Sequence, residues 1–246
     1  MKKNIIILII FAFILIIVGF LLIGENKNLE ENGDTKVIIP KETQSLCYYY
    51  SKEINNGQYD KAWLRLNITG ENVSGEFNNS PAEKDSKIGT IEGTVGPLNQ
   101  KIMGRTANLW WNYLSQGLQI KQELIAEFGD GSASVASGEM INQGDGVYIY
   151  KDKSQLTYTP TLGQIQCENL DEMITVEKYV RDNIKTIATD KPVLGGSWYV
   201  VSIIVNPALH RGEVTYEDGH IQSNATFEYE FNNTTKSVVI NKFEVK

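Results

Sequence analysis

The chain has 246 residues, a formal net charge of −7 and only two cysteines and two histidines. Its acidic surface should repel nucleic acid, so no nucleic-acid partner is expected. With 41% apolar residues the chain can bury one large core or two small ones, and the few histidines supply nucleophilic triads poorly.

A long apolar segment lies close to the N-terminus. Residues 5–24 contain no charge and no proline, and a helix rising ~1.5 Å per residue over this length extends about 30 Å, the thickness of a bilayer core. Lys2 and Lys3 precede the segment and acids follow it. We therefore expect residues 1–24 to be a signal anchor that spans the cell membrane once, with a cytoplasmic N-terminus and extracytoplasmic C-terminal domains. The alternative is a cleaved signal peptide.

Residues 25–45 are rich in Asn, Glu, Lys and Asp and show no sustained periodicity. We predict a flexible linker that reaches at most about 70 Å when fully stretched. Because Lys2 and Lys3 are the only charged residues before it, the chain from residue 25 onward carries a formal charge of −9.

A β domain is predicted over residues 46–167. Apolar and polar side chains alternate in residues 63–68 and 72–77, as in half-buried strands, and Gly70 between them suits a hairpin turn. Gly89 and Gly93 suggest a curved sheet. The further strands expected are residues 87–95, 109–114, 120–128, 133–135, 147–150 and 156–158, with a helix as the alternative for 120–128.

Together with a strand at residues 47–50 these are nine short segments, from which we expect about eight strands that close an up-and-down antiparallel barrel. Cys47 and Cys167 bracket this domain. Two cysteines outside a membrane favour a disulfide, which over so long a loop could stabilise by up to ~4–5 kcal/mol. Two separate buried thiols are the alternative.

The order of Leu64–Ile68, Asn72–Phe77 and Ile88–Val95, with glycine at positions 75, 89 and 93, resembles the glycine-punctuated strands of lipocalin-like (calycin-type) domains in exported bacterial proteins. The resemblance covers about half of the external chain. It implies a barrel that binds something apolar, and it carries over no binding residue.

A small α+β module is predicted over residues 168–246. Apolar residues between Leu170 and Ile187 mark one face of an amphipathic helix, which we expect to dock on the sheet that follows. Residues 198–205 are apolar on both faces, as in a central strand. Strands at 214–216, 226–231 and 238–245 complete a small antiparallel sheet.

Two blocks of this module, residues 194–200 and 214–221, are similar to a C-terminal module of uncharacterised membrane-anchored exported bacterial proteins. The likeness implies the same membrane-anchored location. It implies no activity.

Aromatic side chains supply the candidate ligand-binding residues. Trp63, Trp110, Trp111 and Tyr113 could line a pocket or stack on sugars. The alternative is that they fill the core of the barrel.

Motifs for catalysis or cofactor binding are missing from the sequence, so no catalytic residue, metal or cofactor is predicted. Residues 217–220 combine two acids with His220, and His210 lies ten residues earlier, but the spacing matches no metal signature. Glu83 and Asp85 are a candidate carboxylate pair for glycoside cleavage, and charged loops of this kind usually face water.

The sequence thus predicts a membrane-anchored extracytoplasmic binding module that is not an enzyme. Its expected partner is a small apolar molecule, an envelope glycan or an envelope protein. The alternative is an inhibitor or protein-interaction module that acts through exposed loops such as residues 80–87, and a cell-wall hydrolase is the third possibility.

Overall fold

The computed structural model describes residues 42–55, 57–82 and 84–246. The predicted anchor at residues 1–24 and the linker as far as residue 41 lie outside these ranges. Within them, no helix combines the length and the apolar character needed to cross a bilayer. The described residues belong to one compact unit, Lys41–Lys246, which has its own hydrophobic cores and can therefore fold as an independent segment.

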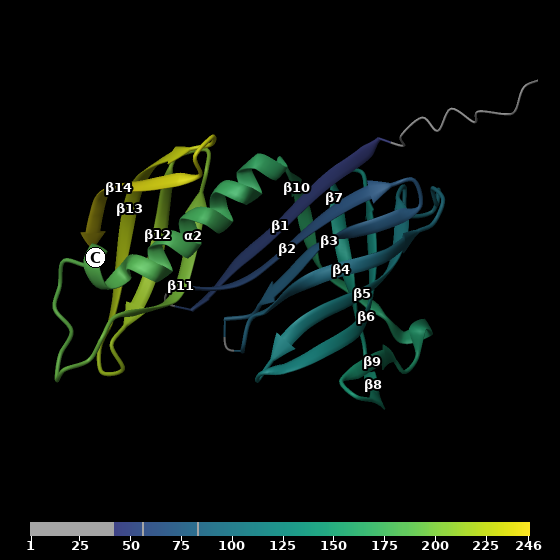
Figure 1. The fold of residues 1–246 in the computed structure, drawn as a ribbon, viewed down its shortest axis with the longest axis horizontal. Coiled ribbons are helices and arrows are strands. Elements are labelled where there is room, and N and C mark those ends of the chain that lie inside the picture. The colour runs from purple at the N-terminus through teal and green to yellow at the C-terminus, as the bar shows by residue number, and fades with distance from the viewer. Residues whose placement is uncertain (1–41, 56, 83) are drawn as a thin grey trace, which may run out of the picture. The chain divides into compact units, whose positions relative to one another are not determined.

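An eight-stranded antiparallel β-barrel forms the first part of this unit, as the sequence predicts (Figure 1). Each strand from β1 to β6 pairs with the one that follows it, and β10 pairs with both β7 and β1, which closes the wall. The strands are β1 (Thr43–Asn55), β2 (Gln58–Thr69), β3 (Asn72–Ser80), β4 (Lys87–Val95), β5 (Arg105–Ser115), β6 (Leu118–Gly129), β7 (Ser132–Ser137) and β10 (Thr157–Ile165).

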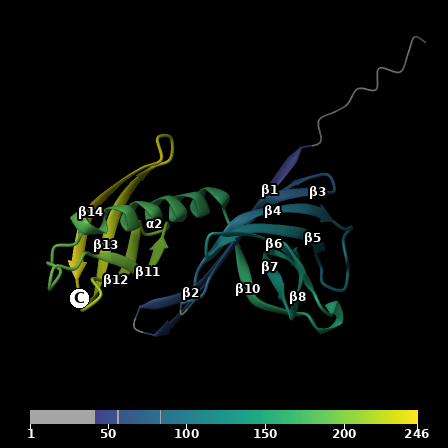
Figure 2. The same ribbon diagram turned by 60° about the horizontal axis from the view of Figure 1, so that its bottom comes forward.

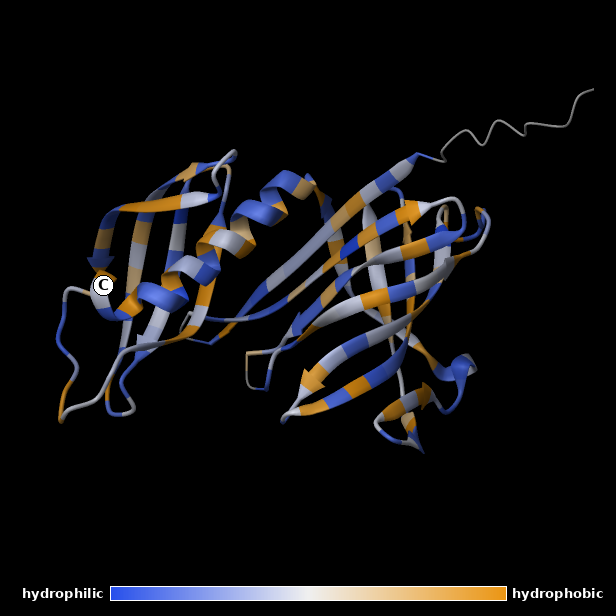
Figure 3. Ribbon diagram, in the orientation of Figure 1, coloured by the Kyte–Doolittle hydropathy of each residue, from blue (hydrophilic) through white to orange (hydrophobic). Residues whose placement is uncertain are grey.

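Alternation of side chains decides which residues face the barrel interior. Leu64 and Leu66 on β2 are completely buried inside, whereas Arg65 between them points outward. The same alternation of apolar and polar residues is visible along most wall strands in Figure 3. Gly70 turns the chain from β2 into β3 with a φ of 70°, a left-handed conformation that glycine adopts without strain.

The predicted curvature at Gly89 has a direct steric cause. A Cβ atom built at this position would lie 1.9 Å from the carbonyl oxygen of Asn112 on β5. Only glycine allows the two strands to approach so closely, and this approach bends the wall.

A hairpin is inserted between β7 and β10, and only half of it was expected. It consists of β8 (Met140–Gly144) and β9 (Val147–Tyr150), followed by the short 3₁₀ helix η1 (Lys153–Gln155). β9 is not a wall strand, because its partners are β8 and, in a parallel pairing at Lys121 and Gln122, the outer part of β6.

Helix α2 (Cys167–Ile187) follows β10 and begins at the second cysteine. The structure joins Cys47 and Cys167 in a disulfide, with a Cα–Cα distance of 5.2 Å. Leu170 on the helix packs on Cys47 and Trp63. The bond thereby fixes the start of α2 on the outside of the barrel.

The C-terminal module is a four-stranded antiparallel sheet with α2 across one face (Figure 2). Its strands, in spatial order, are β11 (Tyr199–Asn206), β12 (Arg211–Glu217), β13 (Gln222–Asn232) and β14 (Ser237–Val245). Val176, Val180 and Ile184 of the helix are fully buried against this sheet.

The prediction of a central strand at residues 198–205 is wrong, because β11 lies at the edge of the sheet. Its two apolar faces have another cause. α2 covers one face, and the tip of the β1–β2 hairpin reaches the other, where Tyr59 N donates to Ser202 Oγ (3.2 Å) and Thr215 Oγ1 donates to Gly57 O (3.1 Å).

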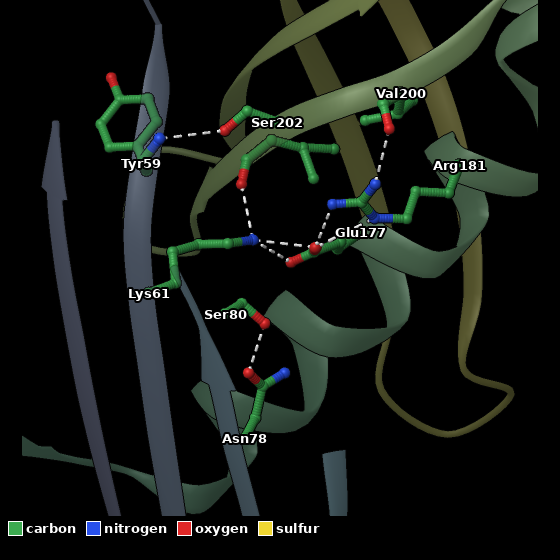
Figure 4. A network of polar contacts seen from close by, with 9 residues as sticks. Tyr59, Lys61, Asn78, Ser80, Glu177, Arg181, Val200 and Ser202 are labelled. Atoms are coloured by element: carbon green, nitrogen blue, oxygen red, sulfur yellow. Dashed lines mark hydrogen bonds and ion pairs between the residues drawn. The ribbon is translucent and has the colours of Figure 1, made fainter. Parts of the chain in front are cut away.

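A polar network joins the barrel, α2 and β11 (Figure 4). Lys61 Nζ on β2 donates to both carboxylate oxygens of Glu177 (2.8 Å each) and to Ile203 O (2.9 Å). Arg181 also donates to Glu177, and its Nη1 donates to Val200 O. Burial lowers the pKa of the Lys61 ammonium, and the Glu177 carboxylate opposes that shift.

Candidate functional site

The four aromatic residues expected to bind a ligand do not form one site. Trp110 and Trp111 are neighbours on β5, so their side chains leave opposite faces of the wall. Trp111 and Tyr113 are buried inside the barrel. Trp110 faces outward with Lys121 Nζ 5.1 Å from its ring centroid, and Trp63 lies on the outer wall beside Cys47.

Side chains fill most of the barrel interior. The interior cluster contains large residues from every part of the wall, including Tyr48, Leu64, Phe77, Ile91, Trp111 and Leu162. An eight-stranded barrel is just wide enough to be filled in this way. Trp111 and Tyr113 therefore help to fill the core of the barrel, which is the alternative role that the sequence left open for the aromatic residues.

A cavity of about 170 Å³ remains at one end of the barrel. It lies where β3, β7 and β10 meet the inserted hairpin, and its wall carries both polar and apolar side chains. The residues that define its character are Phe77, Asn79, Trp111, Gln122, Leu124 and Tyr150.

Trp111 lines this cavity and carries a buried hydrogen-bond donor. Its indole Nε1 is buried, and among the described residues no acceptor lies within hydrogen-bonding distance. The ring is held by Phe77, with centroids 4.8 Å apart in an edge-on arrangement, and by Tyr113 at 4.3 Å. A buried donor without a partner costs about 1–3 kcal/mol, so an acceptor placed beside it is favoured.

Two of the neighbouring polar side chains already have hydrogen-bond partners. Tyr113 Oη donates to Gln122 Oε1 (2.9 Å), which fixes the amide at the cavity wall. Tyr150 Oη donates to Ala136 O (2.8 Å), and its backbone N donates to Glu123 Oε2 (3.1 Å). These bonds hold the inserted hairpin against the barrel. The indole N–H of Trp111, by contrast, is a buried donor without a partner among the described residues.

The cavity suits binding better than acid–base chemistry. Among the described residues that line it, Tyr150 alone has an ionisable side chain. Burial raises the pKa of this phenol to about 12, so it is neutral near pH 7. A general acid or base works best with a pKa close to the working pH.

The acidic patch near His220 has a structural role. Asp218 accepts hydrogen bonds from the backbone N–H groups of Val193, His220 and Ile221, and these bonds lower the pKa of its carboxyl. His210 lies elsewhere, with Nδ1 3.3 Å from Glu172 Oε1. The described part of the chain contains no group of three side chains placed to hold a metal ion. Glu83 is outside the described residues.

Sequence reasoning missed most of the cavity wall. Phe77 follows the period-two pattern of β3, so its inward direction was readable. Tyr150 was not, because its place depends on the parallel pairing of β9 with β6. No protein-family model, curated protein or solved structure matches the chain.

Proposed function

We propose that the protein is a membrane-anchored extracytoplasmic binding protein whose barrel takes a small, mainly apolar ligand with one hydrogen-bond acceptor. One observation carries the proposal. The buried Trp111 N–H has no acceptor among the described residues, and Trp111 lines a partly apolar cavity. A ligand acceptor at that donor would gain both a hydrogen bond and apolar burial.

The volume limits the class of ligand. A cavity of ~150 Å³ holds a benzene molecule, so about 170 Å³ suits a single ring with a short substituent. Most drug-sized ligands occupy pockets of ~300–1,000 Å³, and these would require the inserted hairpin to move. A monocyclic ketone, aldehyde or ether fits both the size and the free donor.

The wider setting is also part of the proposal. The closed eight-stranded wall and the interior glycines support a lipocalin-like relationship to exported bacterial proteins. The apolar segment at residues 5–24 supports a single membrane span, with the barrel outside the cytoplasm. Protease added to intact cells should then reach the barrel. We expect digestion once the disulfide has been reduced and the barrel has unfolded.

Calorimetry on residues 41–246 tests the ligand site. Acetophenone carries one carbonyl acceptor, and cumene is a hydrocarbon of nearly the same shape. We expect tighter binding of acetophenone. Trp111→Phe removes the donor and should weaken acetophenone about 5- to 10-fold, the equivalent of one hydrogen bond, while cumene binding stays the same.

Trp110→Phe is the matched control, because this neighbouring indole faces the outside of the barrel and should leave both affinities unchanged. Equal affinity of acetophenone for the parent and the Trp111→Phe variant would contradict the proposal.

Surface interaction is a second candidate, favoured by the small size of the cavity and by exposed apolar residues near the same end. Ile88, Leu114 and Leu118 are each more than half exposed. Ala62 lines the cavity, so Ala62→Leu should block ligand binding. A protein partner that still binds this variant would favour the second candidate.

A further inference from the structure

The loop between β4 and β5, residues 96–104, exposes three apolar side chains within six positions. Leu98 is 69% exposed, Met103 68% and Ile102 36%. Met103 also has a φ of 48°, a strained conformation for a residue with a side chain. Single exposed apolar residues are common on soluble proteins, whereas a cluster of them on one loop marks an interaction surface.

Hydrogen bonds hold this loop in shape. Asn99 and Gly104 exchange two backbone bonds of 2.7 and 3.2 Å, and Asn99 Oδ1 accepts from the backbone N of Lys101 (3.0 Å). Arg105 Nε donates to Gly96 O (2.9 Å) at the base. The apolar side chains therefore project from a defined turn, and they are not free to fold back onto the barrel.

The loop lies at the end of the barrel where the chain enters. Strand register places one residue of each successive strand in a single row near this end, namely Thr43, Thr69, Asn72, Thr94 and Asn108. Thr43 is the first residue of β1, and Thr94 is the second-last of β4. Thr43, where β1 begins, and the exposed loop thus lie at the same end of the barrel.

Charge at this end allows contact with a lipid surface. Residues 96–105 contain Lys101 and Arg105 and no acid, in an external chain with a formal charge of −9. Glu42 before β1, and Glu71 and Asp130 in the β2–β3 and β6–β7 turns, are acids at the same end of the barrel. Because the loop itself contains no acid, it avoids the repulsion that the acidic parts of the chain would meet at a lipid surface, and Lys101 can reach lipid phosphates while its stem stays in apolar surroundings.

We infer that the β4–β5 loop inserts Leu98, Ile102 and Met103 into the interfacial region of the lipid bilayer. The inference rests on the membrane attachment proposed above. The inserted loop orients the barrel, so that the cavity end, with Leu114 and the inserted hairpin, faces away from the lipid.

The test places a fluorophore on the full chain in phosphatidylcholine vesicles. The two native cysteines are bonded to each other, so Met103→Cys supplies one free thiol for an environment-sensitive NBD label. Leu114→Cys is the matched control, because it is equally exposed at 64% and lies at the other end of β5. We expect blue-shifted emission at position 103 and several-fold stronger quenching there by brominated lipid.

Equal quenching at the two positions would overturn the inference, and so would contact at position 103 that appears only when anionic phosphatidylglycerol is added. An alkaline carbonate wash reports separately on the anchor. Release of the full chain would contradict the attachment and the loop inference together, whereas retention with equal quenching would contradict the loop inference alone.

Discussion

The barrel and the C-terminal module differ in how the edge strands of their sheets are covered. The barrel wall closes on itself, so each strand has two neighbours and the core lies inside. The module is an open sheet of four strands, and its edge strand β11 is covered by α2 and by the β1–β2 hairpin of the barrel. The module therefore depends on groups supplied by the barrel, whereas the barrel encloses its own site.

The largest expected effect comes from removing the disulfide that links β1 to α2. A loop of 120 residues between the cysteines predicts a loss of about 4–5 kcal/mol for the double variant Cys47→Ser, Cys167→Ser. Urea unfolding of residues 41–246 measures it. Because the bond fixes α2, we expect amide exchange to rise first in the module. Unchanged stability would mean that packing alone holds the helix.

The second-largest loss of stability is expected from disrupting the polar network between the barrel and the C-terminal module. Lys61→Ala leaves the Glu177 carboxylate without its main partner and should cost about 2–3 kcal/mol, less than for a completely buried pair because Arg181 remains. Lys178→Ala is the control, since its pair with Asp182 is exposed and should matter by less than about 0.5 kcal/mol. If the two variants lose the same free energy of unfolding, the network around Lys61 contributes no more to stability than an exposed ion pair.

A glycine pair tests the closed wall of the barrel. Gly89→Ala brings a Cβ atom into the Asn112 carbonyl and should cost about 1–3 kcal/mol. Gly163→Ala on β10 meets only Tyr49 O at 4.0 Å, so it should be neutral. Thermal unfolding of the two variants measures the difference. If Gly89→Ala is as stable as the parent, close strand approach does not shape the barrel.

Alkaline pH should give the smallest effect. Burial inside the barrel raises the pKa of Tyr48 from 10.0 to about 12. Below pH 10 the phenol is neutral in both states. Between pH 10 and 12 it ionises only in the unfolded state, so stability is lost as the pH rises. The loss is about 1 kcal/mol after allowance for solvent screening, and Tyr48→Phe should remove it in urea titrations at pH 9 and 11.5. If Tyr48→Phe loses as much stability as the parent at pH 11.5, ionisation of other groups causes the loss.

Local patterns in the sequence were enough to predict the barrel and the helix. Residues 120–128 suit a helix by composition, yet their alternation and the turn at Gly129 correctly favoured a strand. The position of β11 and the inserted hairpin were missed, because both depend on contacts between distant parts of the chain. The four candidate binding residues do not lie together for a simpler reason. Alternation separates Trp110 from Trp111, and composition alone gathered them into one site.

Whether Trp111 meets a ligand acceptor is the central question, and the indole N–H resonance of this residue answers it most directly. In residues 41–246 with ¹⁵N-labelled tryptophan, acetophenone should move the Trp111 signal downfield and slow its exchange with solvent, while cumene should not. The Trp110 signal should stay in place with both. A Trp111 signal that is unmoved at saturating acetophenone, or that responds equally to cumene, would contradict the account.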